Sequence, residues 1–120
     1  MRWLTFPKNK QNKYHNKKVC VNGKIFDSKK EALRYIELVR MEQAGYIVDL
    51  ETQPKFILQS KFKKNGKTIQ AITYFADFMY KETKSNKVIV EDVKGVRTEV
   101  YKIKKKLFEY KYPDLTIVEI

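Results

Sequence analysis

Residues 72–95, ITYFADFMYKETKSNKVIVEDVKG, decide the fold because they are typical of two strands joined by a tight turn. β-branched and aromatic residues fill both arms, and the polar residues 84–87 separate them. Depending on which of these polar residues form the turn, Asp77 faces either Asp92 or Lys94 across the two strands. The two-residue period of a strand also puts Asp92 and Lys94 on one face. The sequence therefore predicts two carboxylates and a lysine at one place on a sheet.

An acid-x-lysine triplet carries little information alone in a chain so rich in both residue types. The triplet that ends at Lys94 differs because it lies in a strand-like segment and has a second carboxylate opposite. Like charges opposed on a strand pair cost stability, so we expect a cation there, bound or covalent. The neighbouring Glu91 lies on the other face, and a bulge of one residue would exchange it with Asp92.

These residue types are suited to metal-dependent phosphate chemistry. Mg²⁺ prefers oxygen ligands, takes one or two carboxylates and keeps several waters, and Mn²⁺ is the alternative ion. We expect Asp77, Asp92 and the carbonyl of Val93 to hold the metal, with Glu31 joining directly or through water. Lys94 would orient a metal-bound water or stabilise the charge that builds on the phosphate. The alternative is a cross-strand ion pair on a solvated sheet.

Charge is the strongest global signal, because 26 basic residues stand against 14 acidic ones for a net charge of +12. Residues 1–24 hold seven basic residues and no acid. A polyanion such as DNA or RNA is the expected partner, with solubility or a loosely ordered tail as the alternatives. The single cysteine excludes an internal disulfide, and no apolar run approaches the length of a membrane span. We expect a cytoplasmic protein with a basic arm at residues 1–18 and one domain at residues 19–120.

The first half of the domain carries clear local signals. Residues 19–26 are typical of a hairpin with an Asn-Gly turn. A helix is predicted from Ser28 to about Ala44, because Ser28 and Glu31 have capping-box spacing and Gly45 is a suitable stop. Its expected buried stripe is Ala32, Leu33, Tyr35, Ile36 and Val39. Glu31 lies at the edge of that stripe, so it can cap the helix and still reach a site beside the sheet.

The second half adds strands and one further helix. Short strands are expected at residues 46–48, 56–58 and 115–120, with a basic Asn-Gly hairpin at residues 61–67. Thr98 is a suitable cap for a helix that runs to about Tyr112 and is ended by Pro113. Its expected inner stripe is Val100, Ile103, Leu107 and Tyr110. The order of elements predicts a mixed α/β (α+β) domain.

Two basic segments are candidate phosphate contacts. The hairpin offers Lys61, Lys63 and Lys64. The start and outer face of the second helix offer Arg97, Thr98, Lys102, Lys105 and Lys106. A solvated helix face and a simple helix cap at Thr98 are the alternatives for this second segment.

The runs FDSKKEALRYIELV, QPKF, ITYFADF, VIVEDVKG and TEVYKIKKKLFEYKYPDL resemble a bacteriophage-encoded family of unassigned function related to the PD-(D/E)XK nucleases. The resemblance covers about residues 12–120. It implies the αβββαβ core of restriction-endonuclease-like and Holliday-junction-resolvase-like enzymes, in which a mixed sheet is flanked by two helices. By position, Asp77 and Asp92 match the motif carboxylates, Lys94 the motif lysine, and Glu31 a glutamate of the first helix. Lys102 and Lys105 match basic residues of the helix after the motif, whereas Ala76 replaces the motif proline.

The resemblance implies a Mg²⁺-dependent endodeoxyribonuclease in the cytoplasm of a phage-infected or lysogenic bacterial host. Branched or recombining phage DNA is one candidate substrate, and a homodimer is the expected assembly of a resolvase. The alternative is a nucleic-acid-binding module or regulator that keeps the fold without cutting. The acidic residues favour the enzyme, since a binder of a polyanion has no need of carboxylates that face it.

Overall fold

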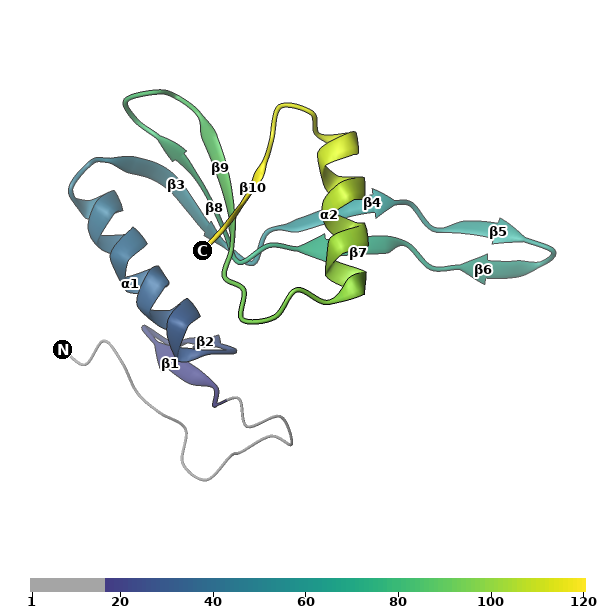
Figure 1. The fold of residues 1–120 in the computed structure, drawn as a ribbon, viewed down its shortest axis with the longest axis horizontal. Coiled ribbons are helices and arrows are strands. Elements are labelled where there is room, and N and C mark those ends of the chain that lie inside the picture. The colour runs from purple at the N-terminus through teal and green to yellow at the C-terminus, as the bar shows by residue number, and fades with distance from the viewer. Residues whose placement is uncertain (1–16) are drawn as a thin grey trace. The chain divides into compact units, whose positions relative to one another are not determined.

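The computed structural model describes residues 17–120, so the sequence-predicted arm lies outside the described residues except for Lys17 and Lys18. The fold is α+β, as predicted, and the described part contains two helices and several small sheets (Figure 1). The chain divides into two compact units, the first ending at Ile47 and the second running from Val48 to Ile120. Within residues 17–120, neither helix is long and apolar enough to cross a membrane.

The first unit begins with the predicted hairpin. Strands β1 (Val19–Val21) and β2 (Lys24–Phe26) pair antiparallel around the Asn-Gly turn. Both turn residues have positive φ, at 50° for Asn22 and 78° for Gly23, which is the conformation that favours this residue pair. The ring of Phe26 lies 5.0 Å from that of Tyr35 on the following helix, so the hairpin packs on the helix through its inward face.

Helix α1 (Lys29–Gln43) begins and ends where its capping residues predict. The Ser28 hydroxyl accepts from the Glu31 amide at 3.1 Å, and Gly45 has a φ of 85° after the C-cap. The buried residues of the helix are Glu31, Ala32, Tyr35 and Leu38. The predicted stripe is therefore wrong at Leu33, which is 45% exposed, because the helix is turned so that Leu38 faces inward.

A four-stranded sheet runs through the second unit in the order β10-β9-β8-β3. Its strands are β3 (Ile47–Thr52), β8 (Phe78–Glu82), β9 (Val88–Asp92) and β10 (Ile117–Glu119). β8 and β9 form an antiparallel hairpin, and β10 returns parallel to β9 after helix α2 (Glu99–Lys111). The sheet is therefore mixed, and α1, β3, β8, β9, α2 and β10 give the predicted αβββαβ order with an insertion after β3.

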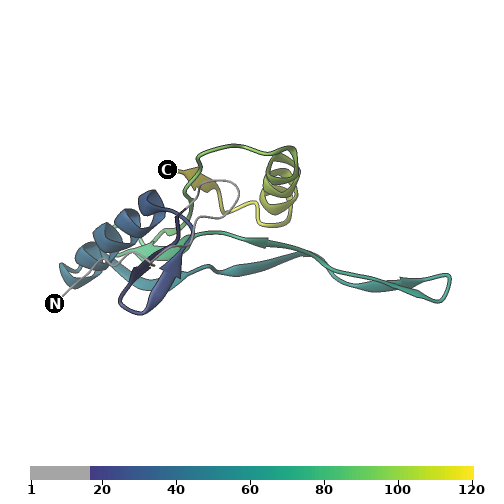
Figure 2. The same cartoon turned by 90° about the horizontal axis from the view of Figure 1, so that it is seen from below.

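The insertion is a long two-stranded ribbon that leaves the sheet after β3 and returns before β8. Its base pairs β4 (Lys55–Gln59) with β7 (Ile72–Phe75), and its tip pairs β5 (Phe62–Lys64) with β6 (Lys67–Ile69). The tip extends past helix α2, which crosses the base (Figures 1 and 2). A register irregularity between Ile57 and Gln59 lies within the base, near its tip end.

The ends of the ribbon meet at the sheet, which corrects one prediction. The first arm of residues 72–95 is two strands, because the chain changes partner from β4 to β9 between Phe75 and Phe78. The Ala76 backbone amide still donates to the Pro54 carbonyl, whereas the Asp77 backbone amide donates to the Glu91 backbone carbonyl at 3.0 Å. The Asp77 carbonyl accepts from the Gln53 amide at 2.9 Å, which closes the base of the insertion.

An aromatic core joins α2 to the ribbon and the sheet. Phe108 is fully buried, and its ring lies 4.8 Å from Phe56 on β4 and 5.7 Å from Tyr74 on β7. The buried residues of α2 are thus Tyr101 and Phe108. The predicted inner stripe of Val100, Ile103, Leu107 and Tyr110 is wrong, since all four are exposed. Periodicity alone could not find the right face, because the ribbon offers an aromatic surface that the larger rings fill better.

Candidate functional site

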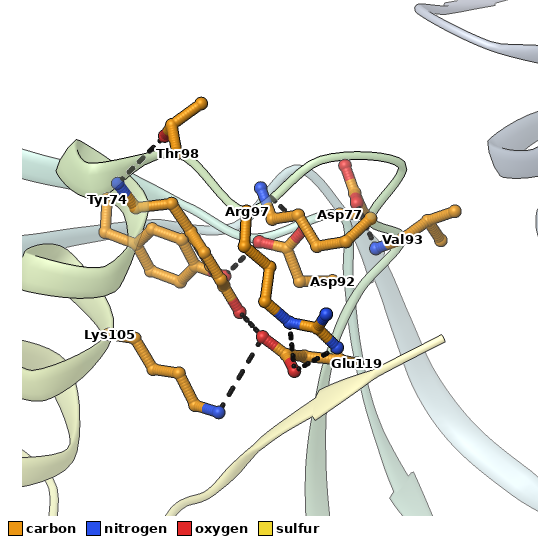
Figure 3. Close-up of polar contacts among 10 residues, drawn as sticks. Tyr74, Asp77, Asp92, Val93, Arg97, Thr98, Lys105 and Glu119 are labelled. Atoms are coloured by element: carbon orange, nitrogen blue, oxygen red, sulfur yellow. Dashed lines mark hydrogen bonds and ion pairs between the residues drawn. The ribbon is translucent and has the colours of Figure 1, made fainter.

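The β8–β9 hairpin brings the two candidate carboxylates together. Its register ends at the pair of Phe78 with Glu91, and the Asp77 backbone amide also donates to the Glu91 carbonyl at 3.0 Å. That Asp77 faces Asp92 or Lys94 directly stays a prediction. Asp77 also accepts a 2.6 Å hydrogen bond from the Val93 amide through its Oδ2 atom (Figure 3). The end of β9 and the residue that precedes β8 are therefore tied together at the predicted site.

Asp92 is a buried carboxylate with a protein donor on each oxygen. It is 2% exposed. Its Oδ1 lies 3.1 Å from the Lys94 Nζ, and its Oδ2 accepts a hydrogen bond from the Tyr74 hydroxyl (Figure 3). A buried carboxylate is stable only when such partners replace its water, so Asp92 is held in one orientation.

Lys94 has a second partner in the aromatic ring of Tyr101. Its Nζ lies 3.9 Å from the ring centroid, within the range of a cation–π contact. Three-quarters of the side chain is covered, since its exposed fraction is 24%. The ammonium group is therefore positioned by a carboxylate on one side and a ring on the other.

Glu119, on β10, extends this polar network away from Asp92. Its carboxylate accepts from the Tyr101 hydroxyl at 2.7 Å and lies 2.9 Å from Arg97 and 3.7 Å from Lys105 (Figure 3). The Arg97 hydrogen bond, followed by that of Tyr101, lowers the pKa of Glu119 from 4.5 to about 2. Glu119 is thus ionised at neutral pH and neutralises part of the basic surface of α2.

Both tyrosines of the network are donors at neutral pH. Burial raises the pKa of Tyr74 far above its ordinary value, and the hydrogen bond to Asp92 raises it further. Burial and the Glu119 hydrogen bond likewise raise the pKa of Tyr101. Sequence reasoning missed Tyr74, Tyr101 and Glu119. The available signal was weak: Tyr74 lies three residues before Asp77, among other aromatic residues that fill the core.

The ambiguity between the two adjacent acids of β9 is resolved by their partners. Glu91 is 1% exposed and accepts a hydrogen bond from the Tyr80 hydroxyl. Tyr80 and Glu91 lie on the opposite face of the β8–β9 hairpin from Asp92, since side chains alternate along β9. No register shift occurs between β8 and β9, so Asp92 is the acid that shares a face with Lys94.

The remaining predicted residues have varied surroundings. Glu31 belongs to the first unit, where it is 5% exposed. Thr98 caps α2, with its hydroxyl accepting from the Tyr101 amide at 3.1 Å. Lys102 pairs with Glu99 at 3.1 Å. Lys102, Lys105 and Lys106 line a surface depression of about 400 Å³ together with Arg97 and Glu119. Lys61, Lys63 and Lys64 are exposed on the ribbon tip.

The donor set suits a hard divalent cation better than zinc. Among residues 17–120, no three His, Cys, Asp or Glu side chains converge as a metal cluster. Asp77, Asp92 and the Val93 carbonyl instead offer two carboxylates and one backbone oxygen at the end of β9. That combination matches the preference of Mg²⁺, which keeps several of its waters.

The comparisons with known proteins give a family but no activity. The family model described as "Protein of unknown function (DUF1064)" matches residues 11–120. This chain belongs to the DUF1064 family. No curated protein and no solved structure matches it. The matched residues include the ribbon and the Asp77–Lys94 region.

Proposed function

We propose that this DUF1064 protein is a divalent-metal-dependent DNA endonuclease that hydrolyses phosphodiester bonds. One observation carries the proposal: at the end of the β8–β9 hairpin, Asp77 accepts from the amide of Val93, the residue after Asp92, and Lys94 is paired to Asp92. Carboxylates gathered at one place in a fold repel each other, and a bound divalent cation would relieve that repulsion.

The chain supplies oxygen ligands and a positioned cation. Asp77, Asp92 and the Val93 carbonyl would hold Mg²⁺ or Mn²⁺. When bound, the metal lowers the pKa of a coordinated water and neutralises charge on the phosphate. The Tyr74 hydroxyl keeps one Asp92 oxygen in place, so the orientation of this ligand is fixed before any metal binds.

Lys94 would act on the reacting phosphate. In the structure its charge is directed by Asp92 and by the ring of Tyr101. A fixed ammonium group favours the phosphorane-like transition state, in which negative charge accumulates, more than it favours bound DNA. The alternative role for Lys94 is to orient the attacking water, since an ammonium group is a hydrogen-bond donor.

The proposal includes a relationship to the PD-(D/E)XK nucleases. It is supported by the αβββαβ order of elements and by the spacing of the two acids and the lysine. Phage DNA in a bacterial cytoplasm, including branched recombination intermediates, is the substrate that this relationship favours. A homodimer would follow if the enzyme resolves symmetric junctions.

A non-catalytic nucleic-acid-binding protein is the second candidate, and one observation favours it. Both oxygens of Asp92 already have protein donors, in Lys94 and Tyr74, as expected for an ion pair that serves stability alone. On this hypothesis the acids hold the β8–β9 hairpin together, and DNA would be bound by basic surfaces elsewhere without being cut.

A cleavage assay separates the two candidates. Branched, duplex and single-stranded DNA of matched length are incubated with the protein in Mg²⁺ or Mn²⁺, with EDTA as the control. The nuclease predicts cleavage that needs metal and is lost in Asp92→Asn, with Glu82→Gln, a half-buried acid of the same hairpin, as the control. Binding without metal-dependent cleavage of any of these substrates would support the non-catalytic candidate.

A further inference from the structure

The ribbon is the most strongly one-signed segment of the described chain. Residues 53–76 hold five lysines and no acid. Four of these lysines, Lys61, Lys63, Lys64 and Lys67, lie in or beside the β5–β6 tip. Every residue from 61 to 70 is exposed on both faces of the ribbon. A two-stranded tip without a core of its own is poorly stabilised, so its length calls for a function.

The tip lysines have no acid to neutralise them. Within residues 17–120, none of the four forms an ion pair, whereas Lys94, Lys102 and Lys105 all do. Lys64 and Lys67 are direct cross-strand partners beside the turn, an arrangement that costs stability by repulsion. Anions on either side of the tip would remove that cost.

The tip also presents apolar side chains between the lysines and the base. Phe62 and Ile69 are cross-strand partners and are 43% and 40% exposed. They share a face with the Lys64–Lys67 pair, because residues two apart in a strand point the same way. This face of the ribbon therefore carries an apolar pair with lysines beside it. Such a face suits a ligand whose floor is less polar and whose edges are negatively charged.

A DNA groove has this character and the right dimensions. Neighbouring strands lie about 4.8 Å apart, so the ribbon is narrow. The major groove of B-DNA is about 12 Å wide, and it admits a two-stranded β-ribbon that lies with one face toward the groove floor. Phosphates line its edges, and thymine methyl groups on its floor accept contacts from residues such as Phe.

We propose that the β5–β6 tip enters the major groove of duplex DNA, with its lysines on the flanking phosphates and Phe62 and Ile69 toward the base edges. The inference rests on the proposed function for the choice of DNA as the polymer. The inference adds that the DNA is double-stranded where it meets the tip, and that the ribbon sets the distance from there to the bond that would be cut.

The base of the ribbon is fixed to the candidate site, so a docked tip would position DNA there. Phe56 of β4 packs on Phe108 of α2, and the Lys111 ammonium group donates to the Ile57 carbonyl. On the paired strand β7, Tyr74 lies opposite Phe56 and donates to Asp92. The same ribbon therefore carries the basic tip at one end and, at the other, the Tyr74 hydroxyl that donates to the candidate metal-binding carboxylate of Asp92.

The test measures binding of metal-free protein in EDTA, so that it does not depend on cleavage. Lys63→Gln/Lys64→Gln/Lys67→Gln is compared with Lys81→Gln/Lys84→Gln/Lys87→Gln, which removes the same charge from the β8–β9 hairpin and its turn. All substituted tip positions are exposed, so the fold is kept, and thermal melting checks this for both variants.

Fluorescence anisotropy is measured with a duplex from about 50 to 200 mM salt. The tip variant should bind at least about tenfold more weakly, with a log–log salt slope shallower by about 2 to 3, since each lost phosphate contact is worth about 0.9. The control variant should change the slope by less than about 1. Equal losses in the two variants would overturn the inference, because they would indicate diffuse charge attraction only.

Two further ligands distinguish the groove from the phosphates alone. Bulky substituents at pyrimidine C5 project into the major groove and should weaken the wild type severalfold while leaving the tip variant unaffected. Duplex RNA of the same sequence should bind more weakly, because its major groove is too deep and narrow to enter. Wild-type binding that is insensitive to the C5 groups, or that prefers RNA or single-stranded DNA, would overturn the inference. A dimer seen by sizing chromatography that depends on the tip residues would also overturn it.

Cleavage assays keep this inference separate from the proposed function. If the tip variant cuts as well as the wild type at low DNA concentration, the DNA-binding role of the tip is wrong and the nuclease proposal stands. If duplex binding needs the tip but the wild type shows no metal-dependent cleavage, the nuclease proposal is wrong and the role of the tip stands.

Discussion

Lysines of the second unit carry the same charge in opposite surroundings. Lys94 is three-quarters covered and is held between Asp92 and the Tyr101 ring. Lys63 and Lys64 are exposed on the ribbon tip, and within residues 17–120 neither forms an ion pair. A fixed cation acts on one developing charge at short range, whereas exposed cations act on a whole polyanion through counterion release. Position, more than net charge, therefore decides which of these lysines we propose for catalysis and which for DNA binding.

Removing the charge of either candidate metal-binding carboxylate should have the largest effect on cleavage. Asp77→Asn and Asp92→Asn each keep the side-chain shape and an acceptor oxygen but weaken the metal site. Cleavage should fall by at least about 100-fold in each variant. DNA binding in EDTA should be unchanged or stronger, because one repulsive charge is gone.

Thermal melting with and without Mn²⁺ checks the same two variants. Metal should raise the melting temperature of the wild type by mass action and raise that of the variants less. If both variants respond to Mn²⁺ as the wild type does, Asp77 and Asp92 do not bind metal and the proposed nuclease site is wrong.

Lys94→Ala tests the fixed lysine itself. Cleavage should fall by about 100-fold while duplex affinity stays within about twofold, since the group acts mainly in the transition state. Stability should drop by about 1–3 kcal/mol, because the buried Asp92 loses a partner. Single-turnover rates and anisotropy measure the two effects separately. A parallel loss of binding and cleavage would make Lys94 a binding lysine like those of the tip.

Tyr74→Phe should give the Asp92 side chain more freedom while leaving its charge and its pairing with Lys94 in place. The variant removes one hydrogen-bond donor from a buried carboxylate. We expect metal affinity to fall about 10- to 100-fold, with much of the activity restored at high Mg²⁺. The Mg²⁺ concentration for half-maximal cleavage is the measurement, and Tyr80→Phe, which removes the equivalent donor to Glu91, is the control. An unchanged Mg²⁺ dependence would limit Tyr74 to core packing.

The smallest expected effect concerns pH and Glu119. Its folded pKa of about 2 lies below the ordinary 4.5, so its stabilising effect is complete above pH 4.5 and is lost as pH falls toward 2. Between these values, wild-type melting temperature should fall more than that of Glu119→Gln by about 1–3 °C, because the ion pair is largely solvated. Parallel curves would contradict the Arg97–Glu119 interaction.

Local chemistry made some features predictable from the sequence. The Asn-Gly turns, the Ser28 and Thr98 caps and the β8–β9 hairpin all depend on residues close in sequence. These signals act through backbone conformation and strand period, which tertiary contacts seldom override.

Features that depend on distant partners were not predictable. The buried face of α2 is chosen by the aromatic surface of the ribbon, so Phe108 is buried and Tyr110 is exposed. The donors around Asp92 come from β7 and from beyond β9, and Glu119 reaches Tyr101 only because β10 returns parallel to β9. No spacing along the chain encodes these meetings.

The hydrogen bond between the Gln53 amide and the Asp77 carbonyl has a consequence for how such a protein can diversify. The chain leaves the sheet and re-enters it at the same point, so the ribbon is an excursion with fixed ends. Doubling the length of such an excursion adds only about 0.6 kcal/mol of closure entropy. Changes beyond the anchored base at Phe56 and Tyr74 therefore leave the sheet untouched. The tip of the ribbon can therefore differ in length and sequence without altering the strands that carry Asp77 and Asp92.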